Sequence, residues 1–339
     1  MWMKKAKSFL VIGCGSIGRR HISNLKTLGL EQVSAFDIRK DRREQTKADF
    51  DVKTHNTLQE GLSTNPDGVL ICSPPHLHYD LALQALKNHS HIFIEKPISN
   101  TTKNLDNLIN IAANKSKILM VGYNLRFNAA LQEASRIITR GDIGRVLSIR
   151  SEYGQYLPNW RPNEDYRKGY ITHDQTGGGI VLEESHEIDY VQWLGGETKK
   201  IFSTMGQVSD LEMQTEDMAL MSLELADGIL AQINVDCVQR GYWRQCKVIG
   251  TYGTLVWESD TGIKIIGDEP ENTKHLKIVP DPNDAYIKEL EHFIKCMEEG
   301  ITPIVDGKKA KQVLEVALAA KESSLLGREV LMSDGKSRS

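Results

Sequence analysis

A glycine-rich turn near the N-terminus constrains the fold more than any other stretch of the sequence. The apolar run at residues 9–12 continues directly into Gly13-Cys-Gly-Ser-Ile-Gly18, a G-x-G-x-x-G pattern. Residues 19–28 then carry apolar side chains at the spacing of one helix face. The pattern therefore predicts a buried strand, a tight turn and a helix in succession, which is the beginning of a strand–helix–strand unit.

Each glycine of this turn has a physical role in a dinucleotide site. Gly13 allows the tight turn, Gly15 lets the backbone approach a pyrophosphate, and Gly18 lets the helix pack closely on the strand. The pyrophosphate is expected at the helix N-terminus, beside Ser16 and Ile17, where unpaired N–H groups favour anions. An isolated G-x-G-x-x-G pattern is equally compatible with an ordinary glycine-rich turn, so a second signal is needed.

The second signal is an acidic residue after the next strand. The strand predicted at residues 32–36 ends at Asp37, which is 37 − 18 = 19 residues beyond the last glycine. An acidic residue about 20 residues on is expected to bind the ribose hydroxyls of the cofactor. Asp37 favours NAD because it would repel a 2′-phosphate, but Arg39 could accept one, so NADP remains an alternative.

The length and composition of the chain limit which classes of protein it can belong to. A chain of 339 residues predicts two domains, and 40% hydrophobic with 26% charged residues is typical of a soluble globular protein. A net charge of −3 gives no indication of a nucleic-acid partner. No apolar run reaches about 18 residues, so no membrane span is expected. Five cysteines without a C-x-x-C pair predict neither a zinc site nor disulfides, and the cytoplasm is the expected location.

Strand and helix patterns divide the chain into two parts. Residues 1–124 alternate short apolar strands with helices, which predicts a doubly wound parallel sheet of the Rossmann type. In residues 125–307 strands dominate and several alternate apolar with polar side chains, which predicts an α+β domain with a mainly antiparallel sheet that turns one face toward a core or a partner. A continuous helix is predicted over residues 180–194, and residues 333–339 are expected to form a loose tail.

Ligands of parallel sheets bind beyond the carboxyl ends of the strands. Three segments follow predicted strands there: residues 73–78, 95–97 and 123–124. Lys96 would lie close to the nicotinamide, where burial lowers a lysine pKa and permits proton exchange. Glu95 beside it could orient the Lys96 side chain. The alternative is that Lys96 is an ordinary surface lysine at the end of a strand. The loop residues expected to support the cofactor are Ser73, Pro74, His76 and His78. The two histidines lack accompanying acidic or cysteine ligands, so no metal is expected.

Two candidate catalytic residues, Glu183 and His186, and a candidate substrate contact, Tyr190, lie on the helix predicted over 180–194. Glu183, His186 and Tyr190 are spaced i, i+3, i+7 and would share one face. A carboxylate one turn from a histidine can fix its tautomer, which suits general acid–base work on a hydroxyl. A histidine satisfied by its neighbour on a solvated face is the alternative.

These motifs together resemble the Gfo/Idh/MocA family, of the glucose–fructose oxidoreductase and inositol dehydrogenase type. The resemblance extends over nearly the whole chain. It rests on V-I-G-C-G-S-I-G at 11–18, C-S-P-P-H-L-H at 72–78, E-K-P at 95–97, G-Y-N-L-R-F at 122–127, G-G-G-I-V-L-E-E-S-H-E-I-D at 177–189 and E-S-S-L-L-G-R at 322–328. It implies a Rossmann domain, a second domain whose open sheet forms homodimers or homotetramers, and a C-terminal helix, about 308–328, packed back on the first domain.

The resemblance also implies residue roles. Lys96 matches the lysine that contacts nicotinamide and substrate, and His186 matches the proton-exchanging histidine. Glu183 stands where an aspartate is usual, and the segment to His186 is one residue shorter than the commonest pattern. Asn124 and Arg126 match positions that often line the substrate site.

The expected reaction is hydride transfer between nicotinamide and a secondary alcohol of a sugar or sugar derivative. The stretch around Trp160, Arg161, Tyr166 and Arg167 resembles family members found with surface-polysaccharide and acidic-sugar pathways, so the substrate could be an acidic or nucleotide-linked sugar. The two arginines could hold a carboxylate or phosphate; a structural loop is the alternative. A nucleotide-binding regulatory protein and an NAD-dependent glycoside-cleaving enzyme are alternatives of the same fold.

Overall fold

The computed structural model describes residues 7–332 and divides the chain into two compact units. The first unit contains the chain up to Asn124 together with Pro282–Lys311, and the second contains Leu125–Asp281 and the chain from Gln312 onward. The predicted tail at 333–339 lies outside the described residues. None of the described helices is long and apolar enough to cross a membrane.

The first unit is built on a parallel sheet of six strands in the order β3-β2-β1-β4-β5-β6. The strands are β1 (Ser8–Ile12), β2 (Gln32–Phe36), β3 (Lys53–Thr54), β4 (Gly68–Ile71), β5 (His91–Glu95) and β6 (Leu119–Gly122). The helices are α1 (Ser16–Thr27), α2 (Lys40–Phe50), α3 (Leu58–Leu62), α4 (His78–Lys87), α5 (Leu105–Asn114) and α9 (Asp284–Glu299). The predicted doubly wound parallel sheet is confirmed.

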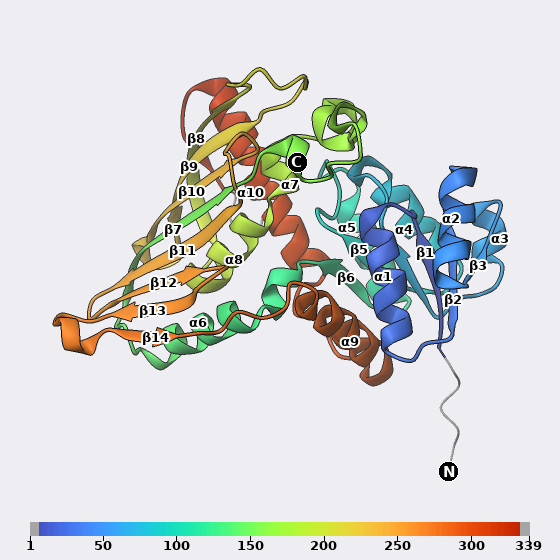
Figure 1. Ribbon diagram of the computed structural model, residues 1–339, viewed down its shortest axis with the longest axis horizontal. Helices are drawn as coiled ribbons and strands as arrows, with labels where there is room; N and C mark the ends of the chain where they lie inside the picture. The colour runs from blue at the N-terminus through green and yellow to red at the C-terminus, as the bar shows by residue number, and fades with distance from the viewer. Residues whose placement is uncertain (1–6, 333–339) are drawn as a thin grey trace, which may run out of the picture. The chain divides into compact units, whose positions relative to one another are not determined.

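Helices cover both faces of this sheet, with α1 and α9 on one face and α4 and α5 on the other (Figure 1). Because both faces are covered, β4 is buried at every residue and reads as a continuous apolar run. The strand order reverses between β1, which pairs with β2, and β4, which pairs with β1 on the other side. Ligands of such sheets bind at this switch point, beyond the carboxyl ends of the strands.

The second unit contains a sheet of nine strands in the order β14-β13-β12-β11-β7-β10-β9-β8-β15. The strands are β7 (Val146–Gly154), β8 (Thr198–Gly206), β9 (Met218–Leu225), β10 (Leu230–Asp236), β11 (Trp243–Gly250), β12 (Thr254–Glu258), β13 (Gly262–Ile266), β14 (Lys274–Leu276) and β15 (Val330–Leu331). All neighbouring strands pair antiparallel except β7 with β10. The predicted mainly antiparallel sheet is confirmed; β13, β14 and β15 were not predicted.

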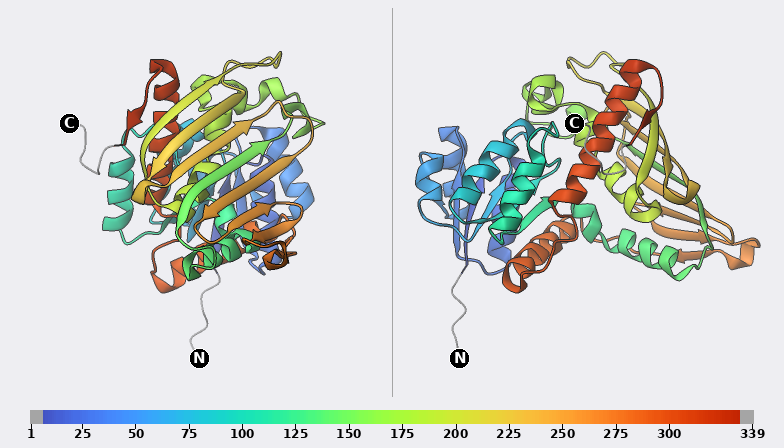
Figure 2. Two further views of the ribbon diagram at one scale, coloured as in Figure 1. Left: turned by 90° about the vertical axis from the view of Figure 1, so that its left-hand side faces the viewer. Right: turned by 180° about the vertical axis from the view of Figure 1, so that it is seen from behind.

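The helices of the second unit are α6 (Ala129–Arg140), α7 (Ile180–Glu183) and α8 (His186–Gly195), and α10 (Gly307–Leu326) belongs to it from residue 312. They lie over one face of the sheet, while the opposite face has no helix over it among the described residues (Figure 2, left). Because helices cover only one face of this sheet, buried and exposed residues alternate along β9 and β10.

The last two long helices are grouped differently from the predicted domains. Helix α9 was predicted in the second domain, but it contacts α1, and the side chains of Asn283 and Asn24 bond each other at 2.8 and 3.2 Å. Most of α10 was predicted to pack on the first domain, but the structure groups it with the second unit. There Ser323 accepts a hydrogen bond from the backbone N–H of Ser203 at 3.0 Å, and Ser324 accepts one from that of Met205 at 3.1 Å.

Candidate active site

The glycine turn has the geometry that the sequence predicts. Gly13 has φ +100°, and a Cβ there would lie 2.5 Å from the carbonyl oxygen of Cys72. A Cβ on Gly18 would lie 1.8 Å from the carbonyl oxygen of Gly13. At Gly15 the nearest atom to a Cβ is 3.7 Å away, in the Arg42 side chain. Two of the glycines are therefore required by packing, whereas the third leaves open space at the helix N-terminus.

This open space fits the pyrophosphate of a dinucleotide. Helix α1 begins after Gly15, and no side chain of the described residues caps it or places an acidic group in its first turn. The first turn of α1, beginning with Ser16 and Ile17, therefore carries no acidic residue and has no side-chain cap from Gly15. A helix N-terminus of this kind binds phosphate through its N–H groups and its dipole.

Asp37 is fixed at the end of β2 by the backbone around it. Its carboxylate accepts hydrogen bonds from the N–H of Cys14 and the N–H of Arg39, both at 2.8 Å. The guanidinium of Arg42 lies 3.9 Å from it. The Arg39 guanidinium pairs with Asp41 instead. The acidic side chain thus joins β2 directly to the glycine turn, as a ribose-binding position requires.

The loops after β4 and β5 are joined by His78. Its two ring nitrogens lie 2.7 Å from the carbonyl oxygen of Ser73 and 2.9 Å from that of Pro97. Burial lowers the pKa of His78, whereas its contacts with carbonyl oxygens raise it. The ring is fully buried and holds these two loops together next to the cis Lys96–Pro97 peptide. Pro74 and His76 lie at the turn between β4 and α4.

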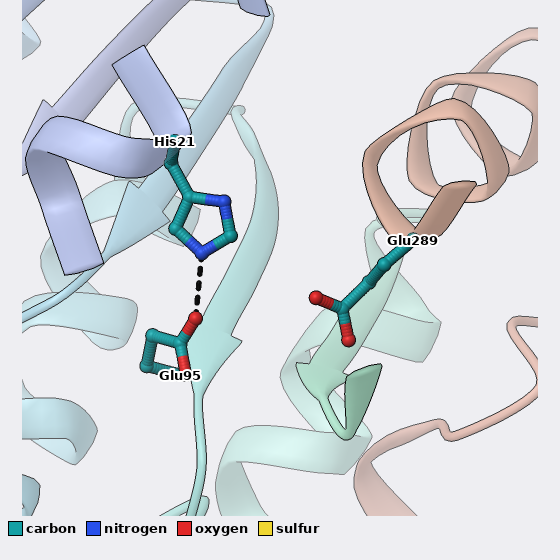
Figure 3. Close-up of side chains that lie close together, drawn as sticks. All are labelled: His21, Glu95 and Glu289. Atoms are coloured by element: carbon teal, nitrogen blue, oxygen red, sulfur yellow. Dashed lines mark hydrogen bonds and ion pairs between the residues drawn. The ribbon is translucent and has the colours of Figure 1, made fainter. Parts of the chain in front are cut away.

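Glu95, directly before Lys96, belongs to a buried group of titratable side chains. Its carboxylate lies 2.6 Å from Nε2 of His21, which comes from α1, and it accepts a hydrogen bond from the Lys96 N–H at 3.2 Å. Glu289 of α9 points toward this pair (Figure 3), and each of the three residues has one possible ligand atom within 4.8 Å of the others.

The distances within this group distinguish a metal site from a hydrogen-bonded pair. Ligand atoms that share a tetrahedral zinc ion at about 2.0–2.2 Å lie more than about 3 Å apart. The N–O distance of 2.6 Å between His21 and Glu95 is instead that of a charge-assisted hydrogen bond. The pair therefore connects the helix of the glycine turn to the strand that carries Lys96.

The prediction of one continuous helix over 180–194 in the second unit is wrong, because the structure has two shorter helices there. Helix α7 ends at Glu183, Glu184 has φ −100° and ψ 33°, and α8 begins at His186. Glu183 therefore does not share a continuous helix face with His186 and Tyr190. The Glu183 carboxylate accepts a hydrogen bond from the hydroxyl of Tyr170.

Tyr190 lies deeper than a substrate-contacting residue would. It is fully buried, and its hydroxyl lies 2.6 Å from Oγ of Ser151 and bonds to the carboxylate of Glu187. Burial raises the pKa of Tyr190 well above its usual value, and the carboxylate of Glu187 adds to this effect. Tyr190 was predicted to contact the substrate, but in the structure it takes part in a buried hydrogen-bond network with Ser151 and Glu187.

Arg126 also binds other residues inside the protein. Its guanidinium donates two hydrogen bonds to the carboxylate of Asp189, at 2.7 and 2.9 Å, and lies over the ring of Trp193 at 4.8 Å. Arg126 and Asp189 are both buried, so the pair fastens the segment after residue 124 to α8. Asn124 is also buried, at the start of a 3-10 turn, Asn124–Phe127.

The predicted substrate loop is held by its own side chains. Trp160 donates a hydrogen bond to the carbonyl oxygen of Gln155 at 2.9 Å. Arg161 lies 3.6 Å from the carboxylate of Glu164, and Arg167 pairs with Asp165 at 2.8 Å and Glu212 at 3.2 Å. Tyr166 accepts a hydrogen bond from the N–H of Glu212. Both arginines are thus already paired with carboxylates of the same unit.

Sequence reasoning missed one cluster in the second unit: Glu184, Glu187 and Arg244. Arg244 on β11 donates hydrogen bonds to both glutamates. The two glutamates flank His186 in the printed sequence, which was a usable signal, but nothing in the local sequence around Arg244 identifies it as their partner.

Two family models match the chain. One, described as an oxidoreductase family with an NAD-binding Rossmann fold, matches residues 7–123, and the GFO/IDH/MocA C-terminal domain matches residues 131–256. These ranges lie in the parallel-sheet unit and the open-sheet unit respectively.

Similar proteins agree with the family models over the whole chain. Myo-inositol 2-dehydrogenase of Thermotoga maritima is 27% identical, with 96% of this chain and 98% of the relative covered. The scyllo-inositol 2-dehydrogenase (NAD(+)) of Bacillus subtilis is 28% identical, with 94% of each covered. A levoglucosan dehydrogenase, solved with NADH and levoglucosan, has the same fold with a TM-score of 0.86 at 18% identity, over 96% of this chain and 99% of that one. The chain therefore belongs to the Gfo/Idh/MocA oxidoreductase family and is an NAD-dependent dehydrogenase.

Proposed function

We propose that this dehydrogenase acts on a secondary alcohol of a neutral cyclic polyol or sugar. The observation that carries the proposal is that the uncapped glycine turn after β1 and Lys96 after β5 belong to the same carboxyl edge of one parallel sheet. A cofactor held by its pyrophosphate at the turn extends along this edge. Inositol dehydrogenases among the similar proteins support a ring alcohol as the substrate.

The proposed mechanism assigns one task to each candidate residue. When bound, NAD supplies the hydride acceptor. Lys96 polarises the substrate hydroxyl oxygen and positions the carbon that loses hydride, while His186 takes the hydroxyl proton. His21 and Glu95 hold the start of the Lys96 turn from beneath.

A neutral substrate is favoured over an acidic or nucleotide-linked one. Arg161 and Arg167 were the candidates for binding a carboxylate or phosphate, but both are exposed and paired with acidic side chains. An anionic substrate would have to displace Glu164, or Asp165 and Glu212, from them.

Cofactor reduction with a panel of inositols, neutral sugars, sugar acids and nucleotide sugars tests the substrate class. We expect turnover with neutral ring alcohols, and kcat/KM at least tenfold lower with acidic ones. Preferential turnover of sugar acids or nucleotide sugars would contradict the proposal for a neutral substrate.

Two substitutions test the catalytic roles. Lys96→Ala and His186→Ala should each lower kcat by about 10²–10⁴-fold, the usual contribution of a positioned acid–base group, while NAD binding is retained. Lys103→Ala and His275→Ala, at exposed positions, are the matched controls. Normal turnover in both active-site variants would show that the roles are wrong.

The same assays separate the alternatives. NAD binding without turnover on any panel member, together with a copurifying protein, would identify a regulatory protein instead. Cleavage of glycosides without net change in the NADH concentration would identify transient oxidation as the reaction.

We also propose that a second copy of the chain covers the uncovered face of the nine-stranded sheet. Phe202, Leu220 and Leu230 are each about half exposed or more on neighbouring strands of this face. Exposed apolar side chains gathered on one surface favour association. Light scattering should therefore give a mass of at least two chains, and Leu220→Lys with Leu230→Glu should reduce it; a monomeric parent protein would contradict the proposal.

A further inference from the structure

The interruption between α7 and α8 determines where His186 lies, yet the local sequence does not explain it. Residues 184 and 185 are Glu and Ser, without a glycine or proline to end a helix. Ser185 precedes α8 but makes no side-chain cap. Contacts with another strand of the second unit offer a cause.

Arg244 supplies these contacts from β11. Its Nε donates a hydrogen bond to the carboxylate of Glu187 at 2.9 Å, and its Nη2 donates one to the carboxylate of Glu184. The guanidinium also lies over the ring of Tyr153, 4.4 Å from the centroid. One side chain thus holds a residue on each side of His186.

The surroundings of Glu187 make this arrangement rigid. Glu187 is fully buried, and its second oxygen accepts hydrogen bonds from Ser151 at 2.5 Å and from Tyr190. Burial raises the pKa of Glu187, and Arg244 opposes this rise most strongly. Burial alone would lower the pKa of Arg244, but the carboxylates of Glu187 and Glu184 reverse this effect and raise it.

We propose that Arg244 is a positioning residue for His186, because its guanidinium bridges Glu184 and Glu187 across the start of α8. This inference rests on the proposed role of His186. A guanidinium presents N–H donors in a fixed planar fork and can serve two carboxylates in a defined geometry, whereas a lysine ammonium is a point charge on a flexible stem. The bridge therefore depends on arginine, and not only on a positive charge.

The consequence for catalysis follows from the placement of the histidine between the two held residues. If the bridge is lost, Glu184 is released and the first turn of α8 can continue the helix of α7 or fray. A shift of about 1 Å in a catalytic group can cost on the order of 100-fold in rate. Arg244 belongs to the second unit, whereas the glycine turn belongs to the first, so cofactor affinity should not change.

Arg244→Lys tests the bridge with the charge retained. We expect kcat to fall by about 10–100-fold, with the NAD dissociation constant within twofold of the parent protein. Hydrogen exchange of the amides in residues 180–190 should become at least tenfold faster, while exchange in β1 and β5 is unchanged. Parent-like kcat together with parent-like exchange in this segment would overturn the proposal.

A second variant covers the case in which Arg244→Lys folds poorly. Arg244→Met with Glu184→Gln and Glu187→Gln removes all three buried charges together, which is better tolerated than leaving one unpaired. It should show the same faster exchange and lower kcat. Ser323→Ala, which loses a buried hydrogen bond to the Ser203 N–H elsewhere in the unit, is the control for general destabilisation and should keep parent-like kcat.

The exchange measurement distinguishes failure of this inference from failure of the proposed function. If the parent protein turns over no polyol or sugar, the proposed function fails, but exchange in residues 180–190 still reports on the bridge. If the parent is active and the variants exchange faster with unchanged kcat, the bridge exists but does not position His186, and the inference is rejected.

Discussion

The glycine turn of the first unit and the start of α8 in the second unit are positioned by different physical means. The turn is set by backbone geometry: Gly18 packs where any Cβ would meet the carbonyl oxygen of Gly13. At the start of α8 the structure instead has ion pairs with distant segments, Arg244 with Glu184 and Glu187, and Arg126 with Asp189. The comparison teaches that a binding motif can be local while the catalytic geometry depends on the whole fold.

The largest expected effect concerns the buried charges of the second unit. Arg126→Met leaves the carboxylate of Asp189 buried without its partner, so it should destabilise the unit by about 3–5 kcal/mol. Urea denaturation measures this loss, and Arg126→Met with Asp189→Leu should recover most of it. If Arg126→Met instead raises the KM for the substrate and leaves stability unchanged, Arg126 binds the substrate. The claim that its ion pair with Asp189 has a structural role in the second unit would then be wrong.

On the side of the glycine turn, Gly18→Ala should cost about 3 kcal/mol, because the new Cβ would lie 1.8 Å from the carbonyl oxygen of Gly13. NAD affinity should fall at least tenfold, as measured by fluorescence titration. Gly206→Ala is the matched control, since a Cβ there meets no atom within 4 Å. Equal NAD affinity in the two variants would show that the turn is not set by backbone packing.

A smaller, pH-dependent effect is expected in the first unit alone. Burial lowers the pKa of His91 from 6.5 to about 4, and its Nδ1 accepts a hydrogen bond from the N–H of Ile118, which requires the neutral ring. The unfolded chain therefore takes up the proton first as pH falls. Stability is fully present above pH 6.5 and should decrease by about 1 kcal/mol toward pH 4, a figure reduced because the ring is partly exposed.

Thermal melts at pH 7 and pH 4.5 measure this change, with His91→Gln as the comparison. The substituted protein should lose less stability than the parent over the same interval. An identical pH dependence in the two proteins would assign the effect to another group.

The smallest effect is expected at the exposed arginine of the predicted substrate loop. Arg167→Gln removes ion pairs with Asp165 and Glu212 that are open to solvent, and such pairs contribute about 0–1 kcal/mol. Neither the melting temperature nor the KM for a neutral substrate should change measurably. A large rise in KM would restore Arg167 as a substrate ligand.

The sequence by itself determined the features that depend on near neighbours. The glycine turn, Asp37 after the second strand and the alternation of strands with helices all follow from spacing within a few dozen residues, because φ/ψ freedom, helix periodicity and strand burial are local properties. For the same reason the alternating pattern of β9 and β10 was sufficient to predict an antiparallel sheet with one face toward a core or a partner.

Only the tertiary structure decided which residues meet across long separations. Arg244 meets Glu184 across 60 residues, and His21 meets Glu95 across 74 residues. The grouping of α9 and α10 likewise depends on contacts with α1 and β8. Such pairings are set by how whole elements pack, and a buried charge finds its partner only after that packing exists, so no local spacing in the sequence records them.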